Sequence, residues 1–192
     1  MAEFFQLRIE LEDIEPMIWR RVAVPSSLTL FELHVVIQGA MGWNDSHLHM
    51  FDISGKRYEI PEDDELGPEP GCFDERLHKL TALLSEGMMF SYVYDFGDDW
   101  RHLIVVEKQD GAVPDWVEPN CIAGERACPP DNCGGRFGYS EFLDGLSNPE
   151  HPEHGERVSW SNNFEPEIFS VSQANSLIAA LRQLFSERDK GI

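Results

Sequence analysis

The stretch MMFSYVYDFGDDWRHLIVVEK, residues 88–108, decides the fold, because two apolar runs flank a short acidic turn. This pattern predicts a β-hairpin with strands over 88–95 and 100–108. The four residues 96–99 would form its loop, with Gly97 supplying a positive φ. A loop needs only one or two ionisable residues, so the three aspartates, one arginine and one histidine that lie over 94–102 call for a further explanation.

The expected register of this hairpin assigns each side chain to a face of the sheet. If residues 96–99 form the loop, Asp95 faces Trp100, and both lie on the same face as His102. Tyr92 and Tyr94 then lie on the opposite face. Asp95 and His102 become diagonal neighbours that can share a hydrogen bond, directly or through one water.

Two interpretations of this acidic turn stay open. In the structural one, the aspartates close the loop and Asp95 orients a partly buried imidazole. In the functional one, Asp95, Asp98 and His102 form an acid-base or metal-binding corner, which His47 and His49 from another strand could complete. That second interpretation predicts a metal-dependent hydrolase or nuclease.

The N-terminal segment predicts a second hairpin followed by a helix. Apolar and polar residues alternate over 4–11, and a second strand is expected over 17–24. Thr29 and Glu32 have the spacing of a helix N-terminal capping box, and Gly42 can end the helix in the left-handed conformation. This helix is the clearest local signal in the chain.

The remaining elements complete an α+β pattern. We expect strands over 47–53 and 56–60, a solvated acidic loop over 59–71, a short helix over 80–86, and helices over 138–146, 151–160 and from about residue 170.

Because hairpins dominate, the order predicts one α+β domain over 1–192, with a mostly antiparallel sheet and helices on one side. Residues 1–108 would be rich in sheet and begin like a β-grasp, by analogy only. Residues 109–192 would hold a Cys/Gly-rich loop and a helical C-terminal third.

Composition limits the partners that the chain can bind. The 192 residues include 35 acidic and 15 basic ones, for a net charge of −20. This charge disfavours nucleic acid and favours a protein partner with a basic face. We find no apolar run of the ~18–20 residues that a membrane helix needs and no export signal, so we expect a cytoplasmic protein with no membrane association.

Cys121, Cys128 and Cys133 lie in a segment rich in glycine and proline, and His154 follows it. Three thiolates and one imidazole would satisfy tetrahedral zinc, so zinc is a possible cofactor. The spacing lacks the tight Cys-x2-Cys pair, however, and buried reduced thiols are the alternative interpretation.

Several blocks together resemble the plasmid pRiA4b ORF-3-like family, which also occurs as a passenger protein of insertion elements. These blocks are IWRRVAVP, LTLFELHVVIQGAMGW, SHLHMF, YVYDFGDDWRHLIVVEK, CIAGERACPPDNCGG and GYSEFL. The resemblance covers nearly the whole chain and implies a compact α+β fold with a regulatory or accessory role and no established reaction. The residues it marks include Trp19, Arg20, His47 and Trp100, which we expect to take part in binding.

The sequence therefore leaves two functional hypotheses. The preferred one is a non-enzymatic binding or accessory module, because no complete set of nucleophile, base or metal ligands follows from spacing. The alternative is the hydrolase or nuclease that uses Asp95, Asp98, His102 and His49.

Overall fold

A computed structural model describes residues 4–61, 71–110 and 118–188, and in this part of the chain eight strands form one sheet. The strand order is β5-β4-β3-β6-β7-β1-β2-β8, and every pair is antiparallel except β4 with β5. The strands are β1 (Phe4–Leu11), β2 (Trp19–Pro25), β3 (His49–Ile53), β4 (Lys56–Glu59), β5 (Cys72–Asp74), β6 (Met89–Tyr94), β7 (Trp100–Asp110) and β8 (Asn120–Glu125).

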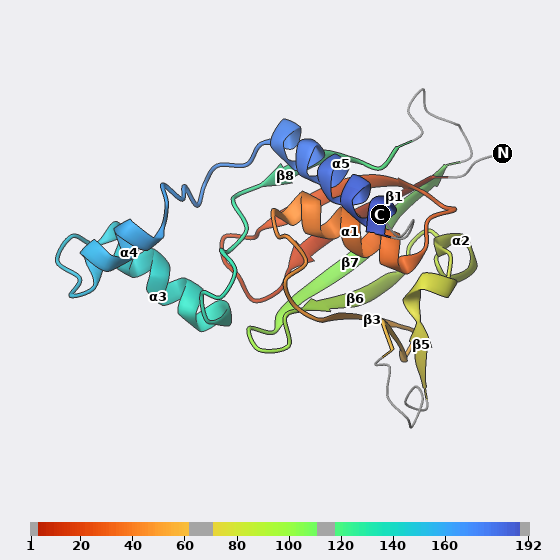
Figure 1. Cartoon of the computed structure of the whole chain (residues 1–192), viewed down its shortest axis with the longest axis horizontal. Coiled ribbons are helices and arrows are strands. Elements are labelled where there is room, and N and C mark those ends of the chain that lie inside the picture. The colour runs from red at the N-terminus through yellow and green to blue at the C-terminus, as the bar shows by residue number, and fades with distance from the viewer. Residues whose placement is uncertain (1–3, 62–70, 111–117, 189–192) are drawn as a thin grey trace.

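Helices cover one face of this sheet and one end of it (Figure 1). Helix α1 crosses in front of the strands and α5 lies on α1, while α3 and α4 form a pair beside the sheet (Figure 1). The helices are α1 (Leu30–Met41), α2 (Leu80–Leu83), α3 (Gly135–Ser147), α4 (His154–Trp160) and α5 (Val171–Arg188), with a 3-10 helix η1 (Glu75–Leu77). The predicted α+β fold with a mostly antiparallel sheet is confirmed.

Helix α1 forms where the sequence predicts it. The Thr29 side chain accepts a hydrogen bond from Glu32 N, and the Glu32 carboxylate accepts one from Thr29 N. Gly42 ends the helix with φ of 101°. These bonds satisfy backbone groups that helix ends otherwise leave without partners.

The core lies between α1 and the sheet. Strand β1 alternates as expected, with Leu7 and Ile9 fully buried and Arg8 on the outer face. The outer face carries polar contacts instead, such as the paired hydrogen bonds that Arg21 donates to Glu107. The sheet is therefore apolar toward the helices and polar toward solvent, as one-sided antiparallel sheets are.

The central hairpin has a different register from the predicted one. Tyr94 pairs with Trp100 and Tyr92 with His102, so the two tyrosines share the buried face with the indole and the imidazole. The loop has five residues because Asp95 also leaves the strand, with φ of 57°. The predicted Asp95–Trp100 pair, and the face assignment that rested on it, are wrong.

The left-handed residues of this loop also differ from the expectation. Asp95 and Asp99 have positive φ, whereas Gly97 does not. Aspartate tolerates this conformation because its short side chain can hydrogen-bond locally, and Asp95 Oδ1 accepts from Gly97 N at 2.9 Å.

The C-terminal third contains a strand that the sequence did not predict. Strand β8 pairs with β2 at the edge of the sheet, and Asn175 of α5 covers part of its outer edge by bonding both Cys121 N and Cys121 O. The short strand β5 was missed as well. Most of the predicted acidic loop, residues 62–70, lies outside the described residues. Within the described residues, no helix is long and apolar enough to cross a membrane.

Candidate functional site: a buried histidine pair and an aromatic pocket

His102 lies in the core rather than at an accessible corner. Its ring is fully buried, and its Nδ1 donates to Tyr92 O at 3.2 Å. Burial lowers the pKa of His102 to about 4, so the ring is neutral at pH 7. Among the contacts of the described residues, its Nε2 has no hydrogen-bond partner. The His102 ring contacts Tyr92 O, whereas the Asp95 carboxylate contacts other groups, so the predicted hydrogen bond between the two is not formed.

Asp95 instead faces His47. Its Oδ2 lies 3.5 Å from His47 Nε2, and its other oxygen bonds the amides of the loop. Asp131 lies nearby, where burial raises the pKa of its carboxyl and the negative charges of Asp95 and Asp98 raise it further. Three carboxylates and one imidazole therefore gather at the turn, without the predicted His102.

The same turn is tied to the cysteine segment. Asp98 Oδ2 accepts a hydrogen bond from Gly134 N at 3.2 Å. A side chain at Gly135 would place its Cβ 2.5 Å from Asp98 O, and Gly135 has φ of 66°. Only glycine permits both this approach and this conformation, so the Gly-Gly pair serves to dock this segment against the hairpin turn.

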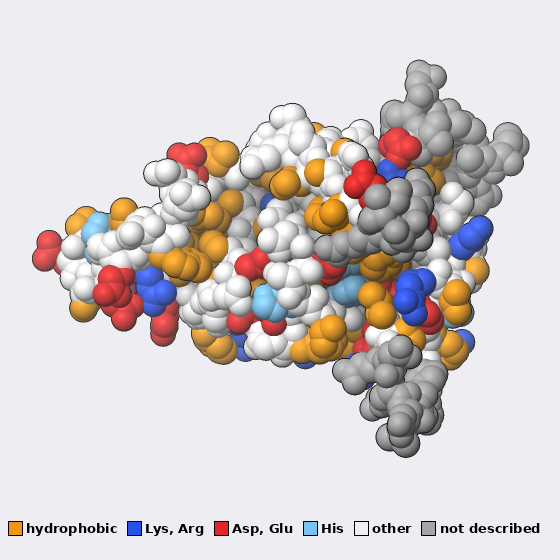
Figure 2. All heavy atoms as spheres, in the orientation of Figure 1, with side chains coloured by type: hydrophobic (Ala, Val, Ile, Leu, Met, Phe, Trp, Pro, Cys, Tyr) orange, Lys and Arg blue, Asp and Glu red, His pale blue; other side chains and the backbone are white. Residues whose placement is uncertain are grey.

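His49 belongs to a second polar cluster, inside the molecule. Its ring stacks on that of His34 from α1, with the ring centroids 3.4 Å apart and the planes 5° from parallel. His49 Nε2 lies 2.8 Å from Glu75 Oε1, and His34 Nε2 lies 2.9 Å from Asp45 Oδ1. The surface of the face that carries α1 also shows histidine and acidic side chains near one another (Figure 2), whereas the His34 ring itself is fully buried.

The hydrogen bonds around His34 assign its protons. Gln38 Oε1 accepts from Asp45 N, so its amide group points Nε2 toward the Tyr92 hydroxyl, 3.0 Å away. The hydroxyl proton is then directed to His34 Nδ1 at 2.8 Å. His34 Nε2 therefore carries the ring proton and donates it to Asp45.

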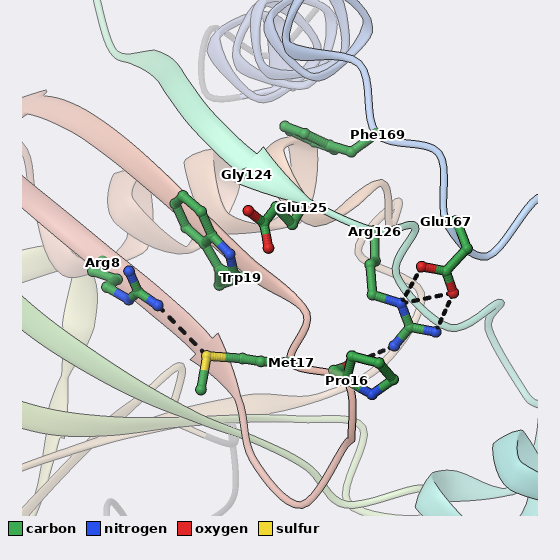
Figure 3. Close-up of a pocket in the computed structure, with 9 residues that line it drawn as sticks. All are labelled: Arg8, Pro16, Met17, Trp19, Gly124, Glu125, Arg126, Glu167 and Phe169. Carbon is green, nitrogen blue, oxygen red and sulfur yellow. Dashed lines mark hydrogen bonds and ion pairs between the residues drawn. The ribbon is translucent and has the colours of Figure 1, made fainter.

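Trp19 lines an open pocket of about 580 Å³ between the start of β2, strand β8 and the segment before α5 (Figure 3). Its walls are mixed, with aromatic and aliphatic surface beside two arginines and two glutamates (Figure 3). Arg126 donates to Glu167 at 2.8 Å, and the Arg8 guanidinium lies 4.5 Å from the centre of the Trp19 ring. The lining residues are Arg8, Pro16, Met17, Trp19, Gly124, Glu125, Arg126, Glu167 and Phe169.

Arg20 supports this pocket from within. It is 1% exposed and donates to Ala40 O, Trp19 O and Glu125 O, each at 2.8 Å. Its guanidinium also lies 3.9 Å from the centre of the Phe169 ring. Arg20 is thus a buried residue that supports the pocket. Trp100 is also buried, and the centre of its ring lies 6.3 Å from that of Trp43 in the core.

The four predicted zinc ligands are not brought together. His154 Nδ1 lies 2.8 Å from Gly145 O, between α3 and α4. Burial raises the pKa of Cys133 to about 12 and that of Cys128 further, which favours the neutral thiol. Within the described residues, one group of possible metal ligands has all its ligand atoms within 4.8 Å of one another, and it consists of His34, Asp45 and His49.

His34, Asp45 and Glu75 were not predicted from the sequence as site residues. A usable signal existed for the first, because His34 and Gln38 are polar residues four apart in a helix that is otherwise apolar over 33–41. Glu75 gave no such signal, since it lies in a charged segment that resembles a surface turn.

Comparisons with known proteins agree with this architecture. A family model described as "Plasmid pRiA4b ORF-3-like protein" matches residues 3–173. An uncharacterized protein y4hQ of Sinorhizobium fredii is 36% identical over 181 residues, which are 93% of this chain and 92% of that protein. The crystal structure of MM3350, a protein of unknown function from Methanosarcina mazei Go1, superposes with a TM-score of 0.81 at 33% identity. That match covers 90% of this chain and 97% of the other.

Proposed function

The chain belongs to the plasmid pRiA4b ORF-3-like family, and on this premise we propose that it is a non-enzymatic binding module for a protein partner. The observation that carries the proposal is the aromatic pocket around Trp19 (Figure 3). Its volume of about 580 Å³ is in the range of ligand sites and exceeds what one side chain needs.

The charges of the pocket favour a basic side chain. Arg126 is neutralised by Glu167, and Arg8 forms an ion pair with Glu10. Glu125 is exposed, and no hydrogen bond or ion pair of its carboxylate occurs among the contacts of the described residues. Among the charged side chains that line the pocket, the one without a charged partner in the described residues is therefore the negative Glu125.

The apolar walls fit the same occupant. A lysine or arginine side chain has a methylene stem that packs on apolar surface and a charged head that stays near water. Trp19, Met17 and Phe169 offer that surface, and Glu125 offers the counter-charge. The net charge of −20 would speed the approach of a basic partner.

The test is selection of binding hexapeptides from a random library, followed by calorimetry on the selected peptides. We expect peptides rich in lysine or arginine, which perturb the Trp19 indole resonance in nuclear magnetic resonance spectra. Glu125→Gln should weaken their binding about 5- to 10-fold, or about 1–1.4 kcal/mol.

A matched variant separates the pocket from the overall charge. Glu141→Gln removes the same charge from an exposed position on α3, and it should leave the affinity unchanged. Equal losses in the two variants, or selection of acidic peptides, would refute the proposed pocket.

A further inference from the structure

The stacked histidines His34 and His49 are an unusual feature of the interior. His34 is fully buried and His49 is 6% exposed. They come from α1 and from the start of β3, so the contact between their rings joins the helix layer to the sheet. Each ring also has its own carboxylate partner, Asp45 for His34 and Glu75 for His49.

The buried charges of this cluster are incompletely balanced. Glu75 is fully buried, and its Oε2 has no hydrogen-bond partner among the described residues. A buried carboxylate normally has full hydrogen bonding or a cation beside it. Here the ion pairs of Asp45 and Glu75, within the described residues, are both with these histidines.

The positions of the ligand atoms supply the second argument. One nitrogen from each ring and one Asp45 oxygen all lie within 4.8 Å of one another. Metal–ligand bonds of ~2.0–2.2 Å place ligand atoms about 3–4 Å apart around a tetrahedral ion. The three groups are thus close to the spacing that a single ion requires, and Glu75 touches one of them.

We propose that His34, His49 and Asp45, joined by Glu75, bind one divalent transition-metal ion of the zinc type. Imidazole nitrogen with carboxylate oxygen suits zinc, whereas magnesium and calcium prefer oxygen alone. The ion would offset the charge of the buried Glu75 and the partly buried Asp45, and it would link α1 to β3 and η1. Coordination through His34 Nε2 would shift the single proton of that neutral ring to Nδ1, where the Tyr92 oxygen lies 2.8 Å away and can accept it in a hydrogen bond.

Binding also requires one ring to turn. A metal ion lies in the plane of each imidazole that binds it, and two nearly parallel rings 3.4 Å apart share no such point. His34 has a hydrogen-bond partner at each ring nitrogen, whereas the side-chain partner of His49 among the described residues is Glu75 at Nε2, so His49 is the ring with more freedom. Metal binding would therefore break the stacking of the His34 and His49 rings and replace it with coordination of both rings to the ion.

The experiment is titration of chelator-treated protein with Zn²⁺, followed by calorimetry and thermal unfolding. We expect one ion per chain, with a melting temperature that rises with Zn²⁺ and not with Mg²⁺. Asp45→Asn and His49→Gln should each weaken Zn²⁺ binding at least tenfold. Circular dichroism of the metal-free variants should match that of the metal-free parent, which confirms that they fold.

His47→Gln is the matched control. His47 lies two residues from His49 but faces Asp95, so its loss should leave Zn²⁺ binding unchanged. Loss of binding in His47→Gln would instead assign the ion to the acidic turn and refute the proposal.

Co²⁺ binding to the parent protein gives a second check that needs no variant. A thiolate-to-cobalt absorption band would assign the ion to the cysteines and would also refute the proposal. Absence of one-to-one binding would refute it as well.

Discussion

At the scale of the residue, Arg20 shows how a charge can be buried for support. Its three carbonyl acceptors lie on β2, α1 and β8, so a single guanidinium joins three elements. The planar guanidinium reaches them at once, whereas a lysine ammonium cannot. Arg20→Lys should therefore lower the free energy of unfolding by about 2–4 kcal/mol, because it leaves buried carbonyls without donors.

Urea unfolding of Arg20→Lys and Arg21→Lys measures this difference. Arg21 is the neighbouring arginine on the outer face, where it pairs with the partly exposed Glu107. Exposed ion pairs contribute little, so Arg21→Lys should cost less than about 1 kcal/mol. Similar losses for the two variants would contradict a supporting role that is specific to Arg20.

Residue-level predictions from the sequence were limited by register. The residue types of the acidic turn were identified, but counting its loop as four residues instead of five moved Asp95 onto the wrong face. A shift of one residue exchanges the faces of a strand. Nothing in the sequence specifies that Asp95 takes positive φ, because the conformation depends on the amides that Asp95 bonds. Hence the pairing with His47 could only be seen in the structure.

At the scale of the element, local sequence signals predicted α1. Strand β8 could not be predicted, because it forms by pairing with a strand that is distant in the sequence. The capping box and Gly42 act within one turn of α1, so the sequence locates both of its ends. Strand β8 has no alternating pattern and forms because β2, about a hundred residues earlier in the chain, offers it an edge. The contact between α1 and α5 could not be predicted either, because the amphipathic pattern of a helix shows which face is buried but not which element covers it.

The crossing of α1 and α5 depends on Gly39. A Cβ at this position would lie 2.6 Å from the backbone of Ile178 on α5. Gly39→Ala should therefore push the helices apart and cost about 1–3 kcal/mol, although alanine favours a helix by roughly 0.5–1 kcal/mol. Gly155→Ala in α4, where nothing lies within 4 Å, should instead stabilise the fold by about that smaller amount. Thermal and urea unfolding of both variants should show opposite signs, and a stabilising Gly39→Ala would contradict close packing at this crossing.

At the scale of the whole molecule, the distribution of charge opposes binding to nucleic acid. Besides the net charge of −20, the arginines of the described residues are mostly neutralised by neighbouring carboxylates, and Arg20 is buried. The ion pairs are Arg8–Glu10, Arg21–Glu107, Arg57–Glu59, Arg76–Asp74, Arg101–Asp99, Arg126–Glu167, Arg136–Asp13, Arg157–Glu153 and Arg182–Glu118. A groove of free arginines that could follow a phosphate backbone is thus absent from the described surface.

We therefore expect no retardation of a DNA duplex in a gel shift at low salt, where electrostatic binding is strongest. Glu107→Gln frees Arg21 on the outer face and should still give no binding, because one added cation does not overcome the negative field. Binding by the parent protein that persists at ~200 mM salt would mean that a local site outweighs the net charge. In that case the acidic surface would select against non-specific contacts, and the basic protein partner proposed for the Trp19 pocket would have to be tested against a nucleic acid.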